Sequence, residues 1–216
     1  PKDSKVTYAD ISVDPKYKDA KSSTDEKDCY VLPQVFPAET EIKIALKDGL
    51  TLEDTVTPSS YRTSYTANIS LDMIRDEDQT KIKDTIKGNL TTIYNGVLQN
   101  KAFQDIKGDL KISSEKEKDI QSEYESLVED LKESSNTLTA ISFTNVTLSR
   151  VEFDDNGELE FRAKVEYKYS IKYSYSGSER TKDSSDSSYV NLAYHLQDGN
   201  YQLVDIDNLV DYFSRY

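Results

Sequence analysis

Tyrosine is the side chain on which most of the possible chemistry of this sequence depends. The 216 residues include 16 tyrosines but only one histidine, one cysteine and no tryptophan. A tyrosine can bury a large ring while its hydroxyl still donates or accepts a hydrogen bond. Four tyrosines at alternate positions of predicted strands are the candidate ligand-binding residues: Tyr167, Tyr169, Tyr173 and Tyr194. They would line a pocket for a glycan or a peptide, or, as the alternative, they are core residues together with Tyr175.

The single histidine and the single cysteine are weak candidates for a site. His195 has the parity of Tyr189 and Asn191, opposite the apolar positions of its strand, which predicts a place on the surface. Cys29 has no second cysteine to pair with and no apolar run before it, so we expect a passive thiol.

The sequence lacks the residues that other kinds of site would need. The acidic turn Asp154-Asp155-Asn156-Gly157-Glu158 has no ladder of alternate ligands and no distant glutamate, so it predicts a turn and not a calcium loop. No cysteine and histidine set has zinc spacing, and the seven glycines form no phosphate-binding loop. Between residues 159 and 175 no carboxylate shares the parity of the tyrosines, so a general base is missing there. We therefore expect no catalytic residue, no metal and no cofactor.

The charge balance limits the class of partner. Lys and Arg number 27 and Asp and Glu number 40, a net charge of −13. A nucleic-acid-binding protein needs a basic surface to displace counterions from phosphates, so nucleic acid is excluded as a partner. No segment approaches the roughly 18 apolar residues of a membrane span. Any attachment to a membrane would use an anchor outside these residues, a possibility raised by a chain that begins at Pro1 without methionine.

The first third of the sequence predicts short strands. Ile42, Ile44 and Leu46 alternate with polar residues, Lys47-Asp48-Gly49 predicts a turn, and a return strand begins at Leu50. A second alternating run extends from Thr63 to Leu71. Residues 1–72 are therefore expected to form a small all-β unit.

Helical periodicity follows. Apolar residues recur at i, i+4, i+8, i+11, i+12 and i+15 on one face of a helix that begins near Asp76, namely Ile82, Ile86, Leu90, Ile93, Tyr94 and Val97. Residues 100–112 are expected to be a connector anchored by three apolar residues, Phe103, Ile106 and Leu110. Ser114 and Glu117 match a capping box before a second helix, which ends by Asn136.

The remainder predicts a bent antiparallel sheet. Shifts of parity predict bulges near Thr144–Asn145 and Ser149–Arg150. Every odd position from Leu159 to Tyr175 is apolar or aromatic, which predicts one long, half-buried strand that must curl. We expect a polar loop over 177–188 that includes Asp183 and Asp186, then strands over 190–196 and 201–206. Leu209, Val210, Tyr212 and Phe213 should form a short capping tail.

This order of elements resembles a known fold family. Two helices followed by four long, bent antiparallel strands over residues 73–216 are similar to the NTF2-like cone, in which a curled sheet wraps a long first helix. The resemblance implies an α+β fold, with the small all-β unit of residues 1–72 in front. NTF2-like enzymes commonly place an Asp–His or Asp–Tyr pair inside the cone.

The front of the chain carries a second resemblance. Cys29-Tyr30-Val31-Leu32-Pro33, Phe36-Pro37 and the segment from Ile42 to Lys47 resemble the small β-repeats of TcaA-like proteins, although those repeats usually have Pro-Gly where this chain has Pro37-Ala38. TcaA-like proteins are membrane-anchored proteins of Gram-positive bacteria with an extracellular NTF2-like domain.

The TcaA-like resemblance implies a non-catalytic binding or scaffolding module at the extracellular face of the membrane or in the cell wall, linked to wall integrity or antibiotic response. Its expected partner is a cell-wall component or an envelope protein. Two alternatives stay open: an NTF2-like enzyme acting on a small molecule, and a ligand-sensing domain coupled to a membrane helix.

Overall fold

The computed structural model describes residues 9–13, 21–22, 30–31, 40–46, 50–56, 70–153, 159–197 and 200–213. In its first part three antiparallel strands pair in the order β1 (Ala9–Val13), β4 (Thr40–Leu46) and β5 (Thr51–Val56). Two short strands, β2 (Lys21–Ser22) and β3 (Tyr30–Val31), pair with each other. The strand expected from Thr63 lies outside the described residues, except that Leu71 belongs to a 3-10 helix, η1 (Leu71–Met73).

Three helices follow, where two were expected. The first, α1 (Asp76–Leu98), begins at the predicted residue and buries most of its predicted apolar face: Ile82, Ile86, Leu90, Ile93 and Tyr94. The expected connector is in fact a helix, α2 (Phe103–Leu110), whose three predicted anchors are all buried. Their spacing of three and four residues already has the helical period.

The third helix, α3 (Glu117–Glu133), lies within the predicted limits, but the predicted capping box is wrong. The helix is preceded by Lys116, which makes no side-chain capping hydrogen bond. Glu117 instead pairs with Lys107 of α2 at 2.7 Å, and this contact lowers the pKa of Glu117.

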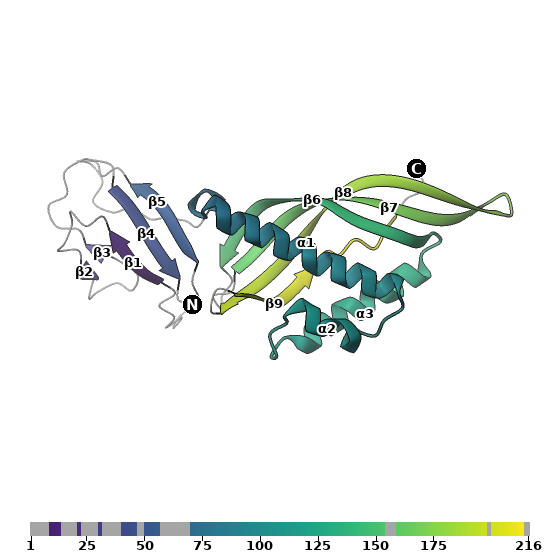
Figure 1. Cartoon of the computed structure of the whole chain (residues 1–216), viewed down its shortest axis with the longest axis horizontal. Coiled ribbons are helices and arrows are strands. Elements are labelled where there is room, and N and C mark those ends of the chain that lie inside the picture. Colours follow the sequence, from purple (N-terminus) through teal and green to yellow (C-terminus); the bar gives the residue numbers. More distant parts are fainter. Residues whose placement is uncertain are drawn as a thin grey trace.

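The strands that follow the helices form a separate sheet, a four-stranded antiparallel meander in the order β6-β7-β8-β9. Its strands are β6 (Thr137–Phe153), β7 (Leu159–Tyr175), β8 (Ser178–Gln197) and β9 (Asn200–Asp207). The bounds of β7 are those predicted. The two predicted bulges are confirmed as register shifts in β6, with a third between Leu138 and Ala140. The chain is thus α+β, and its described residues include three α-helices and this sheet (Figure 1).

The polar loop predicted over residues 177–188 is wrong, because all of these residues after Gly177 form the first half of β8. Ser176 and Gly177 have positive φ angles of 52° and 77°, and they join Tyr175 to its partner Ser178. A two-residue turn with both φ angles positive matches the twist of a hairpin, so β7 leads directly into β8. Backbone pairing between β7 and β8 holds this hairpin together, and an apolar face on β8 does not contribute.

The core lies between α1 and the sheet. In Figure 1, α1 runs along one face of the sheet, with α2 and α3 beside its far end. Phe143 on β6 meets Tyr94 on α1 at a centroid distance of 5.2 Å, and Phe161 and Ile171 of β7 are fully buried. Leu52 of β5 bridges to Ile74 and is buried in the same cluster, which ties β5 to the start of α1. The expected boundary between residues 72 and 73 falls within η1.

Candidate binding groove at the edge of β8

The four tyrosines predicted as ligand contacts occupy different environments. Tyr194 is 1% exposed, Tyr167 is 4% exposed and Tyr169 is 5% exposed, whereas Tyr173 is half-buried. The hydroxyl of Tyr194 accepts a hydrogen bond of 3.1 Å from the Asn89 side chain, and burial raises its pKa. Tyr194 is therefore a core residue with a satisfied hydroxyl.

Aromatic rings pack together on the face of the sheet that α1 covers. Tyr167 and Tyr169 are 5.9 Å apart, and Phe213 packs against them at 6.1 Å and 5.0 Å. Phe143 continues the contact from Tyr167 towards α1 at 6.1 Å. In the described residues no buried side-chain polar atom lacks a hydrogen-bond partner. This region packs as a core, so a ligand has to be sought at its margin.

A groove of about 720 Å³ opens at that margin, between β8 and the segment that follows β9. Its size is typical of ligand-binding pockets. Its lining comes from strands β6 to β8 and from that segment: Arg150, Glu152, Glu160, Arg162, Tyr167, Asp186, Ser187, Ser188, Tyr189, Asn191, Asn208, Leu209, Val210, Asp211 and Tyr212. We call it the β8-edge groove. Of the four predicted tyrosines, Tyr167 alone lines it.

The segment after β9 forms one wall. Asn208 has a φ of 58°, and its backbone N–H and side-chain amide each donate a 2.7 Å hydrogen bond to the Asp207 carboxylate, which turns the chain away from the sheet. The Val210 carbonyl accepts a 2.7 Å hydrogen bond from Tyr94, and the Phe213 carbonyl accepts one of 2.8 Å from Asn136. The predicted tail thus caps the core through Val210 and Phe213, whereas Tyr212 is 73% exposed.

The outer rim is charged. The guanidinium of Arg162 lies 4.6 Å from the ring centroid of Tyr189, which is 46% exposed. Arg150 makes an ion pair of 2.6 Å with Glu152. Both guanidinium groups of the groove are thereby engaged by the protein itself. Two aromatic rings of the groove are exposed to solvent: Tyr189, with Arg162 over its ring, and Tyr212.

Asp186 is the site residue that sequence reasoning missed. It faces Tyr167 in the register of β7 and β8, so it adds a carboxylate of the parity that β7 lacks. Burial, reinforced by the charge of Asp186 and by Tyr169, raises the pKa of Tyr167 to about 12 and keeps its hydroxyl neutral. The pairing of Tyr167 with Asp186 could not be predicted while residues 177–188 were expected to form a loop. The signal in the sequence that indicates it is the Ser176-Gly177 turn.

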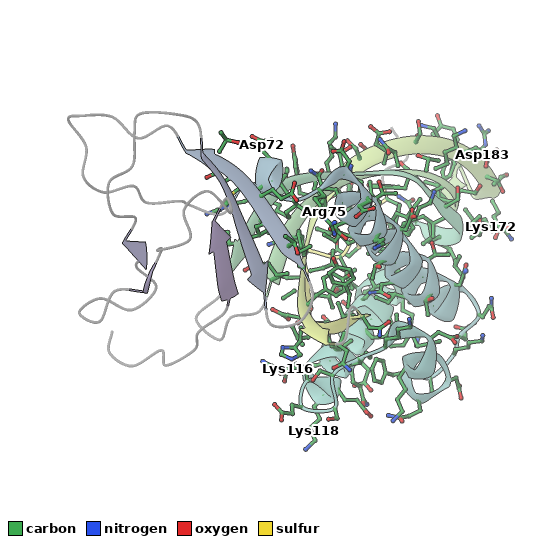
Figure 2. The ribbon with its side chains drawn as sticks, turned by 60° about the vertical axis from the view of Figure 1, so that its left-hand side comes forward. Asp72, Arg75, Lys116, Lys118, Lys172 and Asp183 are labelled. Atoms are coloured by element: carbon green, nitrogen blue, oxygen red, sulfur yellow. The ribbon has the colours of Figure 1, made fainter. Side chains whose placement is uncertain are left out.

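The remaining candidates are not in the groove. His195 is exposed, as its parity predicted, and pairs with Gln202 of β9. Cys29 and the acidic turn lie outside the described residues. Figure 2 shows Lys172 and Asp183 at the far end of the β7–β8 hairpin and Arg75 at the start of α1. Arg75 pairs with Asp78 at 2.7 Å, and Ser170 donates a hydrogen bond of 2.6 Å to Asp183.

Three further findings bear on the class of protein. Among the described residues no group of three or more histidine, cysteine or acidic side chains could hold a metal ion. Within the same part of the chain, none of the helices has the length and apolar character needed to cross a bilayer. Comparisons with models of protein families, with curated proteins and with solved structures give no match.

Proposed function

We propose that this chain is a non-catalytic binding module of a bacterial cell envelope, with the β8-edge groove as its binding surface. The proposal keeps the resemblance of the chain to TcaA-like extracellular regions and of residues 73–216 to the NTF2-like cone. Its partner is then a cell-wall component or an envelope protein at the outer face of the cell.

One observation carries the proposal. The rings of Tyr167, Tyr169 and Phe213 pack against one another on the face of the sheet that α1 covers, where an NTF2-like enzyme would have its Asp–His or Asp–Tyr pair. The hollow lies outside this core and combines two exposed tyrosines with polar side chains. Exposed tyrosines give a large contact area at low entropic cost, which suits recognition.

The pair of Tyr167 and Asp186 fits this role better than acid–base catalysis. The pKa of Tyr167 is raised further from neutral pH, to about 12, whereas a general base or acid needs a pKa near the working pH, so its hydroxyl serves as a neutral hydrogen-bond donor. Asp186 is exposed, whereas acid–base carboxylates are tuned by removal from water. A neutral donor beside a solvated carboxylate favours polar recognition.

The test is a sedimentation assay with Gram-positive peptidoglycan sacculi and with protoplast membranes. We expect the purified chain to be retained by at least one of them above a charge-matched control protein. Replacing Tyr189 and Tyr212 together with alanine should weaken retention about tenfold. Tyr175→Ala is the matched control, because Tyr175 is 53% exposed but lies outside the groove. Absence of retention by both preparations would refute the proposal.

A further inference from the structure

The β8-edge groove lies beside the part of β8 that β9 does not reach, where a further strand could pair. The last pair between β8 and β9 is Asn191 with Asp207, after which Asn208 turns the chain away. Over residues 178–190, β8 pairs with β7 on one side, and no described strand pairs with its other side. Along such an edge, every second residue presents an N–H and a C=O group that no neighbouring strand satisfies.

The groove is hollowed along this edge. Asp186, Ser187, Ser188 and Tyr189 form one wall, and residues 208–212 form the other. The first wall is a strand whose edge pairs with no described strand, and there the Ser187 N–H donates a 2.7 Å hydrogen bond to the Asp186 carboxylate, which an added strand would have to displace. The second wall is held by Tyr94 and Asn136. A guest in extended conformation can continue the line of β9, because it finds backbone partners on one wall and side-chain contacts on the other.

The charges of the groove lining determine which sign of charge a bound ligand should carry. Four carboxylates line the groove, from Glu152, Glu160, Asp186 and Asp211, against the guanidinium groups of Arg150 and Arg162. Arg150 is paired with Glu152, and Arg162 lies over the ring of Tyr189. The remaining carboxylates face the groove without a cationic partner among the described residues. A positively charged guest is therefore favoured, in keeping with a net charge of −13.

We infer that the guest is a lysine- or arginine-bearing polypeptide segment that adds to β8 as a further strand. This inference rests on the proposed function and names the class of partner for the same groove. The peptide backbone would pair with the edge of β8 between Ser184 and Val190. Its cationic side chains would meet Asp186 and Asp211, and its apolar side chains would contact Tyr189 and Tyr212.

Two other occupants fit less well. A glycan lacks the regular row of amide groups that an open strand edge requires. A second copy of the chain would bring two surfaces of net charge −13 together, which opposes association through this edge. A polypeptide of opposite charge satisfies both the backbone and the side chains.

The experiment uses a defined probe, a capped peptide of about nine alternating lysine and valine residues, long enough to span about 30 Å as a strand. The comparison peptides replace every lysine with glutamate or carry N-methyl groups on every backbone amide. Fluorescence polarisation measures affinity, and amide hydrogen exchange of the whole chain locates the contact. We expect the lysine peptide alone to bind, with slower exchange between Ser184 and Val190.

Charge reversal in the groove supplies the matched variants. Asp186→Lys combined with Asp211→Lys should weaken binding of the lysine peptide about tenfold and strengthen that of the glutamate peptide. Glu129→Lys combined with Asp130→Lys makes the same change in net charge on the exposed end of α3 and should alter affinity less than about twofold.

The outcomes separate this inference from the proposed function. Binding that survives N-methylation, or that ignores the reversal of Asp186 and Asp211, overturns strand addition. If sacculi retain the chain through Tyr189 and Tyr212 but the peptide does not bind, the proposed binding module stands. The inference that its ligand is a polypeptide is then overturned. Failure of the peptide, the sacculi and the membranes alike overturns both.

Discussion

The Tyr94 hydroxyl of α1 donates a hydrogen bond of 2.7 Å to the carbonyl oxygen of Val210, which lies beyond the last strand. Tyr94 is fully buried and Val210 is 7% exposed, so this bond joins the central helix to the wall of the β8-edge groove away from bulk water. Asn136, which precedes β6, holds the carbonyl of Phe213 in the same way. The groove thus has one wall made by a strand and one made by a segment fastened to the core.

Tyr94→Phe should lower the free energy of unfolding by about 1–2 kcal/mol, because it leaves the buried Val210 carbonyl without its donor. Urea denaturation followed by circular dichroism measures the change. Tyr212→Phe is the control: its side chain is 73% exposed, so we expect a change within about 0.5 kcal/mol. Equal effects of the two substitutions would show that the bond contributes nothing.

Two glycines of α1 should respond in opposite directions to alanine. A Cβ atom at Gly96 would lie 3.0 Å from the Tyr124 hydroxyl and 3.1 Å from Ile106, so Gly96→Ala should destabilise the fold by about 1–3 kcal/mol. At Gly88 nothing lies within 4 Å, so Gly88→Ala should stabilise it by about 0.5–1 kcal/mol through helix propensity. Thermal unfolding of both variants checks the pair. A stable Gly96→Ala protein would contradict the close packing of the three helices.

Stability should decline in strong alkali. The pKa of a tyrosine in the unfolded chain is about 10. Burial raises the pKa of Tyr167 to about 12, with help from Asp186 and Tyr169, and that of Tyr201 to about 12, with help from Asp78. Between these pH values the unfolded chain has released protons that the folded chain keeps, so the free energy of unfolding falls as the pH rises. Below about pH 10 these groups contribute no slope.

Urea titrations between about pH 9 and pH 12 test this dependence. Tyr201→Phe should make the decline shallower, since it removes one of the contributing groups. Tyr212→Phe serves as the comparison. A free energy of unfolding that stays constant over this range would contradict the burial of Tyr167 and Tyr201.

The open edge of β8 should depend on its charges to prevent self-association. Lys182→Val combined with Asp183→Val removes two charges from this edge and raises its β propensity, so we expect concentration-dependent association by light scattering. Lys164→Val with Glu166→Val likewise removes one charge of each sign, but from β7, which has partners on both sides, and should leave the size distribution as in the wild type. Association of both variants alike would point to a general loss of solubility.

The sequence predicted those elements whose burial leaves a periodic signal. The apolar face of α1 recurs with the period of a helix, and β7 alternates over all 17 of its residues, so both were located from their side chains alone. The bulges in β6 were visible for the same reason, since each one changes the parity of the buried residues.

The first half of β8 escaped prediction because its side chains carry no such signal. Residues from Ser178 to Ser188 are almost all polar, and they form a strand because β7 offers them its open backbone groups. Tertiary pairing outweighs local propensity there. The groove depends on this half of β8 and on the turn at Asn208, so the candidate site could not be derived from the sequence, although Tyr167 was named.

The bond between Tyr94 and Val210 also bears on the order of folding. The two residues are 116 positions apart, and the bond of Asn89 with Tyr194 spans 105 positions. During synthesis α1 leaves the ribosome before the strands that cover its apolar face, and the last of its partners, Tyr194 and Val210, follow more than 100 residues later. Contacts of such long range also slow folding, because the loop between them has to close first. The hydrogen bonds of Asn89 and Tyr94 can therefore form only after residues 194–210 have emerged, whereas the contact of Tyr94 with Phe143 can form earlier.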